Sequence, residues 1–408
     1  MTRDTPPLNS RAAPHTGIAA LLAMTLALGP FALDTYLPAF PAIAASLSVS
    51  VHQVSLTVSA YVFMLAFGQL SGGPLSDHFG RERVMLAGLA LFAVASLLIV
   101  QATSVTEFVL LRVFQAFGGG WAVVCVPALV RDRLSGREAA KFFSLIGLLM
   151  VLAPAIAPSL GSLLLNSFGW FSIFLFLGIY GFTMIVLLKS LIFRRYVRPA
   201  PPHEQVTVWQ RYLAVIAVRP AMRFMFTGGL AFSVMMLFIT HASFIYQEYF
   251  GASPGAFALL FGANVVLMLL MNLLNRRLLN YFPPERILRW SLTAQCGGII
   301  LLLLVMNIRP ELWLFLPAMI LTIGVLGAVS PNIQACYMEY FPQHSGTAAA
   351  LMGATQFSLA GLISAASALL PESVIAIVLA MGVCSVLALL LIWNHHIPAA
   401  GKTAAAGQ

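Results

Sequence analysis

Long apolar runs are the feature that most limits what this chain can fold into. Runs of roughly 18 to 27 apolar residues recur along its length, and each is long enough to cross the hydrocarbon core of a bilayer as a helix. Only 9% of the residues are charged, whereas soluble domains carry about 25%. The blocks of alternating hydrophobicity that are typical of membrane barrels do not occur. The sequence therefore predicts an all-α polytopic membrane protein.

Polar stretches divide the apolar runs into twelve predicted transmembrane helices. The first is interpreted as a membrane helix and not as a cleaved signal, because it lacks an early small-residue cleavage site. The predicted spans cover residues 17–41, 51–73, 84–101, 107–130, 139–165, 170–191, 222–247, 254–279, 286–307, 312–335, 346–370 and 373–393.

The longest polar stretch, residues 194–204, separates the sixth span from the seventh and is rich in arginine and proline. We interpret it as a solvated linker between two six-helix bundles. The segment Val206–Val218 is moderately amphipathic and is predicted to lie along the membrane surface. The predicted units are an N-terminal tail, a first bundle, the linker, a second bundle and a C-terminal tail, at residues 1–16, 17–191, 192–221, 222–393 and 394–408.

Basic residues collect on one side of the predicted helices. If the N-terminus is cytoplasmic, the opposite side holds Arg309 alone, and Arg112 lies within a span. Because Lys and Arg gather in cytoplasmic loops, this bias predicts that both termini are cytoplasmic. It also accounts for the net charge of +9, so no nucleic-acid partner is expected.

Two ionisable residues are predicted well inside spans, Asp34 in the first and Arg112 in the fourth. A charged residue at a helix centre costs roughly 2.5–3.5 kcal/mol, so such residues usually face a cavity or a partner. Both fall in the outer half of the membrane at similar depth, which allows an ion pair if the two helices are neighbours. Two interpretations stay open: a static pair that locks two helices, and a proton site that loads from one side and releases to the other.

Weaker polar candidates for a substrate cavity also lie within the spans. Each of them equally suits an ordinary hydrogen bond between helices, and the histidine among them suits a packing role as well as a cavity. These candidates are Tyr36, Tyr61, Gln115, His241 and Asn264.

A loop rich in glycine joins the second span to the third. Gly73 and Gly80 permit a tight cytoplasmic turn, and Asp77 can pair with Arg81 or with a nearby helix end. The loop therefore predicts a polar turn on the cytoplasmic side.

Prolines mark the fifth span. Pro154 and Pro158 remove backbone donors and bend the helix, and small neighbours up to Gly161 allow another helix to approach closely. The stretch serves either packing alone or a bent helix that takes part in gating.

Motifs for nucleotide hydrolysis or catalysis are missing from the sequence, which has no G-x-x-x-x-G-K-[ST], H-E-x-x-H or G-x-S-x-G pattern. We therefore expect no enzyme, no ATP-driven pump and no cofactor, but coupling to an ion gradient. The cysteines lie inside apolar runs without metal-binding spacing, so no metal site is expected. They are Cys125, Cys296, Cys336 and Cys384.

The loop after the second span resembles the G-x-L-a-D-r-x-G-r-[RK] signature of the major facilitator superfamily. Asp77, Gly80 and Arg81 match this signature, whereas His78 and Glu82 stand where a basic residue is usual. On its own, this loop indicates the superfamily.

Motifs in three spans resemble one branch of that superfamily, the Bcr/CflA (bicyclomycin and chloramphenicol resistance) drug:proton antiporters. Asp34–Pro38 is similar to the first-helix D-M-Y-L-P signature, with Thr35 in place of Met. The fourth-helix R-x-x-Q-G pattern begins at Arg112, although Ala116 replaces its glycine. Ala153–Gly161 resembles the A-P-x-x-A-P-x-x-G antiporter motif of the fifth helix.

The resemblance implies the major facilitator fold, in which two six-helix bundles rock around a midplane site. It implies that Asp34 carries the proton, that Arg112 is its electrostatic partner, and that Asp77 and Arg81 belong to a cytoplasmic latch. The implied function is proton-coupled efflux of small, amphiphilic drugs or metabolites across the bacterial inner membrane by a monomer without a cofactor.

Three alternatives remain open at the level of sequence. The chain can instead be a proton symporter that imports a nutrient, or an exporter of one metabolite. It can also be a non-transporting membrane receptor on the same fold.

Overall fold

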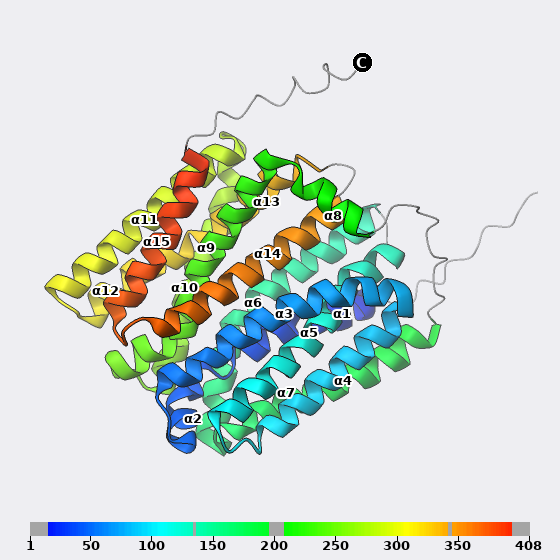
Figure 1. The fold of residues 1–408 in the computed structure, drawn as a ribbon, viewed down its shortest axis with the longest axis horizontal. Helices are drawn as coiled ribbons and strands as arrows, with labels where there is room; N and C mark the ends of the chain where they lie inside the picture. Colours follow the sequence, from blue (N-terminus) through cyan, green and yellow to red (C-terminus); the bar gives the residue numbers. More distant parts are fainter. Residues whose placement is uncertain (1–14, 134–135, 196–207, 342–344, 394–408) are drawn as a thin grey trace, which may run out of the picture.

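The computed structural model describes residues 15–133, 136–195, 208–341 and 345–393, which are almost entirely helical (Figure 1). The first half of the chain forms α1 (His15–Asp34), α2 (Phe40–Leu47), α3 (Val51–Phe79), α4 (Arg81–Ile99), α5 (Val105–Arg133), α6 (Gly136–Phe168) and α7 (Phe171–Leu187), followed by a π-helical turn at Leu188–Ile192 and a 3₁₀ turn at Phe193–Arg195.

The second half begins with the short helix α8 (Val208–Ile216), within the segment that the sequence predicts to be amphipathic. It continues through α9 (Arg219–Ser243), a π-helical turn (Phe244–Tyr249), α10 (Pro254–Leu278), α11 (Pro284–Ile308), α12 (Leu312–Gly324), α13 (Leu326–Met338), α14 (Ser345–Ala366), a 3₁₀ turn (Ser367–Leu369) and α15 (Val374–Trp393).

The predicted membrane spans are confirmed. Among the described residues, 11 helical segments are long and apolar enough to cross a membrane, and the shorter apolar segment Leu152–Phe168 belongs to α6. Each of these segments coincides with one predicted span. The architecture is therefore an all-α polytopic one with twelve helical spans.

The first predicted span is not one continuous helix. The helix α1 ends at Asp34, a 3₁₀ turn covers Leu37–Ala39, and α2 then continues the apolar segment. Pro38 accounts for the interruption, because it has no N–H for the carbonyl of Asp34 four residues earlier and its ring crowds that carbonyl. The predicted span 17–41 is therefore confirmed as an apolar segment, but it contains a break that was not predicted, and the break places Asp34 at a helix end.

The tenth predicted span is also interrupted, at Val325 between α12 and α13. Gly324 stands directly before the interruption, and glycine weakens a helix by roughly 1 kcal/mol relative to alanine. Glycine is nevertheless required nearby: a Cβ added to Gly327 would overlap the backbone oxygen of Met268 in α10. Close packing of α13 on α10 thus requires small residues where the helix is interrupted.

The two halves of the chain meet along two pairs of helices. The helix α3 lies along α14, and α6 lies along α10 (Figure 1). At Gly361 of α14, an added Cβ would lie only 2.9 Å from the Cα atom of Phe63 in α3. At this point the two bundles therefore approach each other closely, with no room for a larger side chain at Gly361.

Each end of the molecule carries one short helix, from which it takes its name. The α2 face comprises α2 with the connections 48–50, 250–253 and 370–373, and the α8 face comprises α8 with Gly80 and the connection 279–283. Four side-chain hydrogen bonds that join described residues of different bundles lie toward the α2 face. They join Gln247 to the Leu37 carbonyl, Ser50 to Glu372, His52 to the Ala368 carbonyl, and Ser59 to Ser364. In this conformation the bundles are closed at the α2 face.

Candidate functional site

Asp34 is a buried carboxyl at the end of a helix. It is the last residue of α1, and only 3% of its surface is exposed. Its Oδ1 atom has no hydrogen-bond partner. The C-terminal end of a helix carries partial negative charge, and an unpaired carboxylate in apolar surroundings costs free energy. Asp34 is thus placed where binding a proton relieves an uncompensated charge.

Arg112 lies within α5 and is fully buried. Its guanidinium carbon is 4.3 Å from the centre of the Tyr36 ring and 4.2 Å from that of the Tyr61 ring. Both distances are in the range of cation–π contacts, which are strongest where the groups are desolvated. The Nε and Nη2 atoms of Arg112 have no hydrogen-bond partner. The two tyrosines therefore hold the cation mainly by their ring faces.

A short hydrogen-bonded chain fixes the remaining side of Arg112. Its Nη1 atom donates to the Gln115 Oε1 atom at 2.5 Å, and the Gln115 Nε2 atom donates to Ser96 Oγ at 2.7 Å. Ser96 in turn donates to the Phe92 carbonyl. The chain orients the guanidinium and joins α5 to α4, so the site has a rigid support on one side.

The ion pair that the sequence allows between Asp34 and Arg112 is absent between the described side chains, although α1 and α5 are neighbours. The cation is instead enclosed by aromatic rings, and the carboxyl has its own position at the break of α1. This arrangement leaves both charged residues without an ionic partner, so a static lock between them is not present in this conformation.

The sequence-predicted cavity residues do not form one group. Tyr36, Tyr61 and Gln115 surround Arg112 in the first bundle. His241 and Asn264 lie in the second bundle, where His241 bonds to Ser367 at 2.8 Å and Asn264 donates to the carbonyl of Leu260 at 2.9 Å. The first three are therefore part of the arginine site, and the other two belong to separate surroundings.

The second bundle contains a cavity of about 210 Å³ between α9, α10, α13 and α14. Its walls carry side-chain amides, sulfur atoms and an aromatic ring, and none of the described lining residues is charged. The sequence prediction missed this cavity; the signal that it left unused was the pair of glutamines inside apolar helices. The lining residues are Gly228, Ala231, Phe232, Met235, Met268, Leu326, Ser330, Ile333, Gln334 and Gln356.

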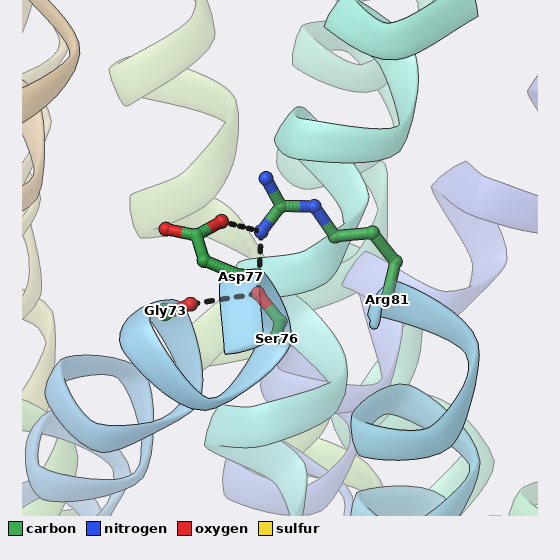
Figure 2. A network of polar contacts seen from close by, with 4 residues as sticks. All are labelled: Gly73, Ser76, Asp77 and Arg81. Carbon is green, nitrogen blue, oxygen red and sulfur yellow. Dashed lines mark hydrogen bonds and ion pairs between the residues drawn. The ribbon is translucent and has the colours of Figure 1, made fainter. Parts of the chain in front are cut away.

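The turn between α3 and α4 contains the predicted polar contact. Figure 2 shows Arg81 reaching back across the turn, where its Nη1 atom lies 2.5 Å from Asp77 Oδ1 and 2.5 Å from Ser76 Oγ. Ser76 donates to the Gly73 carbonyl at 2.8 Å. Gly80 has φ +98°, a conformation that favours glycine. The ion pair thus connects the end of one span to the start of the next.

The proline motif of α6 packs directly on the break of the first span. A Cβ added to Gly161 would overlap the carbonyl oxygen of Thr35, the residue after Asp34. Pro154 and Pro158 precede this contact within α6, and α6 also lies along α10 of the other bundle. The helix α6 therefore contacts both the carboxyl site and the other bundle.

The sequence pattern of the Major Facilitator Superfamily matches residues 21–365. The chain belongs to this superfamily. It is 30% identical over 365 residues to a bicyclomycin resistance protein homolog of Haemophilus influenzae, a match that covers 89% of this chain and 92% of that protein. It is 28% identical to a chloramphenicol resistance protein of Pseudomonas aeruginosa, over 77% of this chain and 76% of that protein. The family and these relatives indicate a multi-pass membrane transporter and not an enzyme.

Solved structures share the fold. A D-xylose–proton symporter superimposes with a TM-score of 0.72 at 17% sequence identity, covering 92% of this chain and 97% of the symporter. At this identity the likeness shows the major facilitator fold alone. The arrangement of two six-helix bundles is thereby confirmed for this chain.

Proposed function

We propose that this transporter is a proton-coupled exporter of small, amphiphilic drugs or metabolites, working by alternating access in the bacterial inner membrane as a monomer without a cofactor. The observation that carries the proposal is Asp34: a buried carboxyl without an ionic partner, placed at a helix break against which α6 packs. Relatives named for bicyclomycin and chloramphenicol resistance support the outward direction.

The proposed orientation places the α8 face in the cytoplasm together with both termini. The basic residues near the ends of the spans support it, because Arg81, Arg276 and Arg286 all lie at the α8 face. The α2 face is then exposed to the outside. In the present conformation the outer end of the transporter is closed.

Proton exchange at Asp34 can drive this export. When the bundles open outward, Asp34 takes up a proton from outside, and when they open inward it releases that proton to the cytoplasm. Each inward proton supplies about 2.3 kcal/mol per 100 mV of membrane potential. At about 1.4 kcal/mol per decade, one proton exchanged for one neutral substrate supports roughly a 50-fold gradient per 100 mV.

Arg112 has a different proposed role. Because aromatic rings and Gln115 hold the guanidinium near α1, it supplies a fixed positive potential to the first bundle. Tyr36 and Tyr61 are proposed to face substrate when the bundles separate, and the uncharged cavity of the second bundle is proposed to hold its apolar part. The absence of charge on the described cavity wall favours neutral substrates.

Inverted membrane vesicles test the coupling. Their interior is acidified by respiration, and a pH-sensitive dye reports proton release when chloramphenicol is added. We expect release from vesicles that contain the wild-type protein, and a signal at least about tenfold smaller with Asp34→Asn, which keeps the shape of the side chain but cannot exchange a proton. Glu311→Gln makes the same chemical change at an exposed connection and should behave as wild type.

The direction of transport is measured in the same vesicles with radiolabelled chloramphenicol. An exporter accumulates it in the acidified interior, whereas a symporter that imports does not. Equal proton traces for wild type and Asp34→Asn, together with drug accumulation by both, would exclude Asp34 as the coupling residue.

A further inference from the structure

Two histidines from different bundles stack on each other at the α2 face. His52, in the first turn of α3, and His241, near the end of α9, have ring centres 5.7 Å apart and ring planes inclined by 23°. His52 is partly exposed, whereas His241 is 99% buried by neighbours, with 1% of its surface accessible. The pair therefore reaches from the outer surface into the contact between the bundles.

The hydrogen bonds of these rings determine which nitrogens carry hydrogen. His52 Nε2 lies 3.0 Å from the carbonyl oxygen of Ala368, which can only accept, so this nitrogen donates. Ser367 donates its single hydroxyl hydrogen to the Ser364 carbonyl at 2.6 Å and is left to accept from His241 Nε2 at 2.8 Å. Both rings thus donate through Nε2, which leaves Nδ1 as the second nitrogen of each.

In an uncharged imidazole that donates through Nε2, the second nitrogen carries a basic lone pair. In His241 this atom, Nδ1, is buried and has no hydrogen-bond partner. An unpaired buried acceptor costs free energy in the closed conformation, and imidazole is the side chain that ordinarily takes up a proton between about pH 5 and 8. The closed α2 face therefore contains a vacant proton-binding atom, separate from Asp34.

The charged groups around the pair decide how many protons the closed form can hold. Carboxylates at this end of the molecule include Glu107, Glu248, Glu311 and Glu372. Glu372 accepts a hydrogen bond from Ser50, two residues before His52, at 3.5 Å. The start of α3, which carries His52, therefore has a carboxylate neighbour. For His241, however, the facing ionisable group is His52 itself. A second proton would put two positive rings in contact, and like charges repel.

We propose that His52 and His241 form an external proton sensor that opens the α2 face at acid pH. The closed form accommodates one proton on the pair, whereas the open form separates the rings into water and accommodates two. Acid outside then shifts the population toward the outward-open form. The inference rests on the proposed orientation of the α2 face but not on proton coupling at Asp34.

Such a sensor adds a control that the exchange cycle alone does not have. The outer face opens most readily when external protons are abundant, which is the condition in which proton entry can do work. When the outside is alkaline, the closed form is favoured, and the substrate pathway does not open toward a medium that cannot drive export.

A distance measurement between the bundles tests the sensor. Spin labels are attached to Gln101→Cys and Asn307→Cys, at exposed positions on the α2 side of each bundle and away from the histidines, after replacement of the four native cysteines. Distances are recorded by pulsed electron resonance in lipid nanodiscs at about pH 7.5 and about pH 5.5, which bracket the titration of imidazole. We expect the ratio of open to closed protein to rise about tenfold on acidification, equivalent to about 1.4 kcal/mol.

Variants separate the histidines from other causes. Glutamine can keep the donor toward Ser367 but does not titrate, so the double variant His52→Gln/His241→Gln should have the same distances at both pH values. Ser59→Ala removes an uncharged contact between the bundles; it should keep a response to acid as large as that of the wild type. The response should also persist in an Asp34→Asn background.

Three results would overturn the proposal. They are unchanged distances in the wild type on acidification, a full response in the double glutamine variant, and loss of the response in Asp34→Asn alone. The last result would assign the pH dependence to Asp34 and leave the proposed exchange mechanism intact. If proton-coupled export failed but the histidine response to acid were retained, the exchange mechanism would be excluded and the sensor would stand.

Discussion

The two bundles share a fold but differ in where they place charge. Among the described residues, the buried side chains of the Asp, Glu, Lys and Arg types are Asp34 and Arg112, and both belong to the first bundle. The second bundle buries amides, hydroxyls and His241 instead, for example Asn332, which donates to Asn275 at 2.6 Å. Burying a charge costs more free energy than burying a hydrogen-bonded amide. The two buried charged side chains therefore lower the stability of the first bundle, which indicates that they have a functional role.

This difference suggests that the two bundles have different roles in transport. The first bundle supplies the buried carboxyl and guanidinium groups, and the second supplies an uncharged cavity and the amides that hold its helices together. Matched substitutions in the two bundles should then alter different measured properties, and not the same property by different amounts.

The largest effect is expected for Arg112→Met. The change removes a hydrogen bond to a charged group, with a contribution of about 1.5–3 kcal/mol, and desolvated cation–π contacts of about 2 kcal/mol. We expect drug-driven proton release to fall at least about 100-fold, since each factor of ten corresponds to about 1.4 kcal/mol. Vesicle assays normalised to membrane-inserted protein measure it.

Arg309→Met is the matched control, because Arg309 is exposed in the connection after α11. We expect Arg309→Met to release as many protons as the wild type does. Normal release by Arg112→Met would show that the first bundle does not need its buried cation.

Glycine contacts test the comparison at the next level. A Cβ at Gly161 would overlap Thr35 beside the carboxyl site, and a Cβ at Gly327 would overlap Met268 inside the second bundle. Overpacking typically costs about 1–3 kcal/mol, so Gly161→Ala and Gly327→Ala should both lower the thermal unfolding midpoint. Of the two, Gly161→Ala should also change the number of protons released per drug molecule.

Gly262→Ala is the control for this pair, because a Cβ at Gly262 meets no atom within 4 Å. Its midpoint should match that of the wild type. A changed number of protons released per drug molecule in Gly327→Ala would contradict the proposed difference in role between the bundles.

A smaller effect is expected in the cavity of the second bundle. Gln356→Ala removes an amide from its wall, and the truncation of one such contact costs about 1–2 kcal/mol, a factor of roughly 5 to 30. We expect the KM for chloramphenicol to rise by that factor while proton release at saturating drug is unchanged. Leu259→Ala, at an exposed position of α10, should leave the KM unaltered.

The smallest effect is expected at the α8 face. The side chains of Arg81 and Asp77 are 22% and 59% exposed, and an exposed ion pair contributes at most about 1 kcal/mol. Asp77→Asn should therefore shift the thermal unfolding midpoint only slightly. Its counterpart at the start of α11, Glu285→Gln, should do the same, and a large shift in the first variant would indicate a stronger latch.

Much of the fold could be predicted because the bilayer imposes its own length on each helix. Twelve apolar runs and their basic flanks are local signals, and they predicted the spans within a few residues. The break at Asp34 was missed although its cause is also local: Pro38 stands four residues after Asp34, where a helix would need its N–H. The length of the apolar run favoured one continuous span, and the proline was not interpreted as a break.

The site was less predictable because it depends on directions in space. The sequence placed Asp34 and Arg112 at similar depth, but only the structure shows that the guanidinium lies between the rings of Tyr36 and Tyr61. The cavity was missed for a related reason. An apolar helix has the same composition on its lipid side and on its cavity side, so Met235 and Met268 are not distinguished by pattern alone.

The hydroxyl chain that closes the α2 face has a consequence for the speed of transport. Ser59 lies 2.8 Å from Ser364, and Thr240 lies 2.6 Å from the same oxygen. The Thr240 contact lies within the second bundle, whereas Ser59 and Ser364 belong to different bundles. A hydroxyl can donate or accept, so Ser59 and Ser364 can each exchange the other for water when the bundles part, with little net loss. Water can therefore replace this contact between the bundles, and we expect its breaking and re-forming to add little to the barrier of each transport cycle.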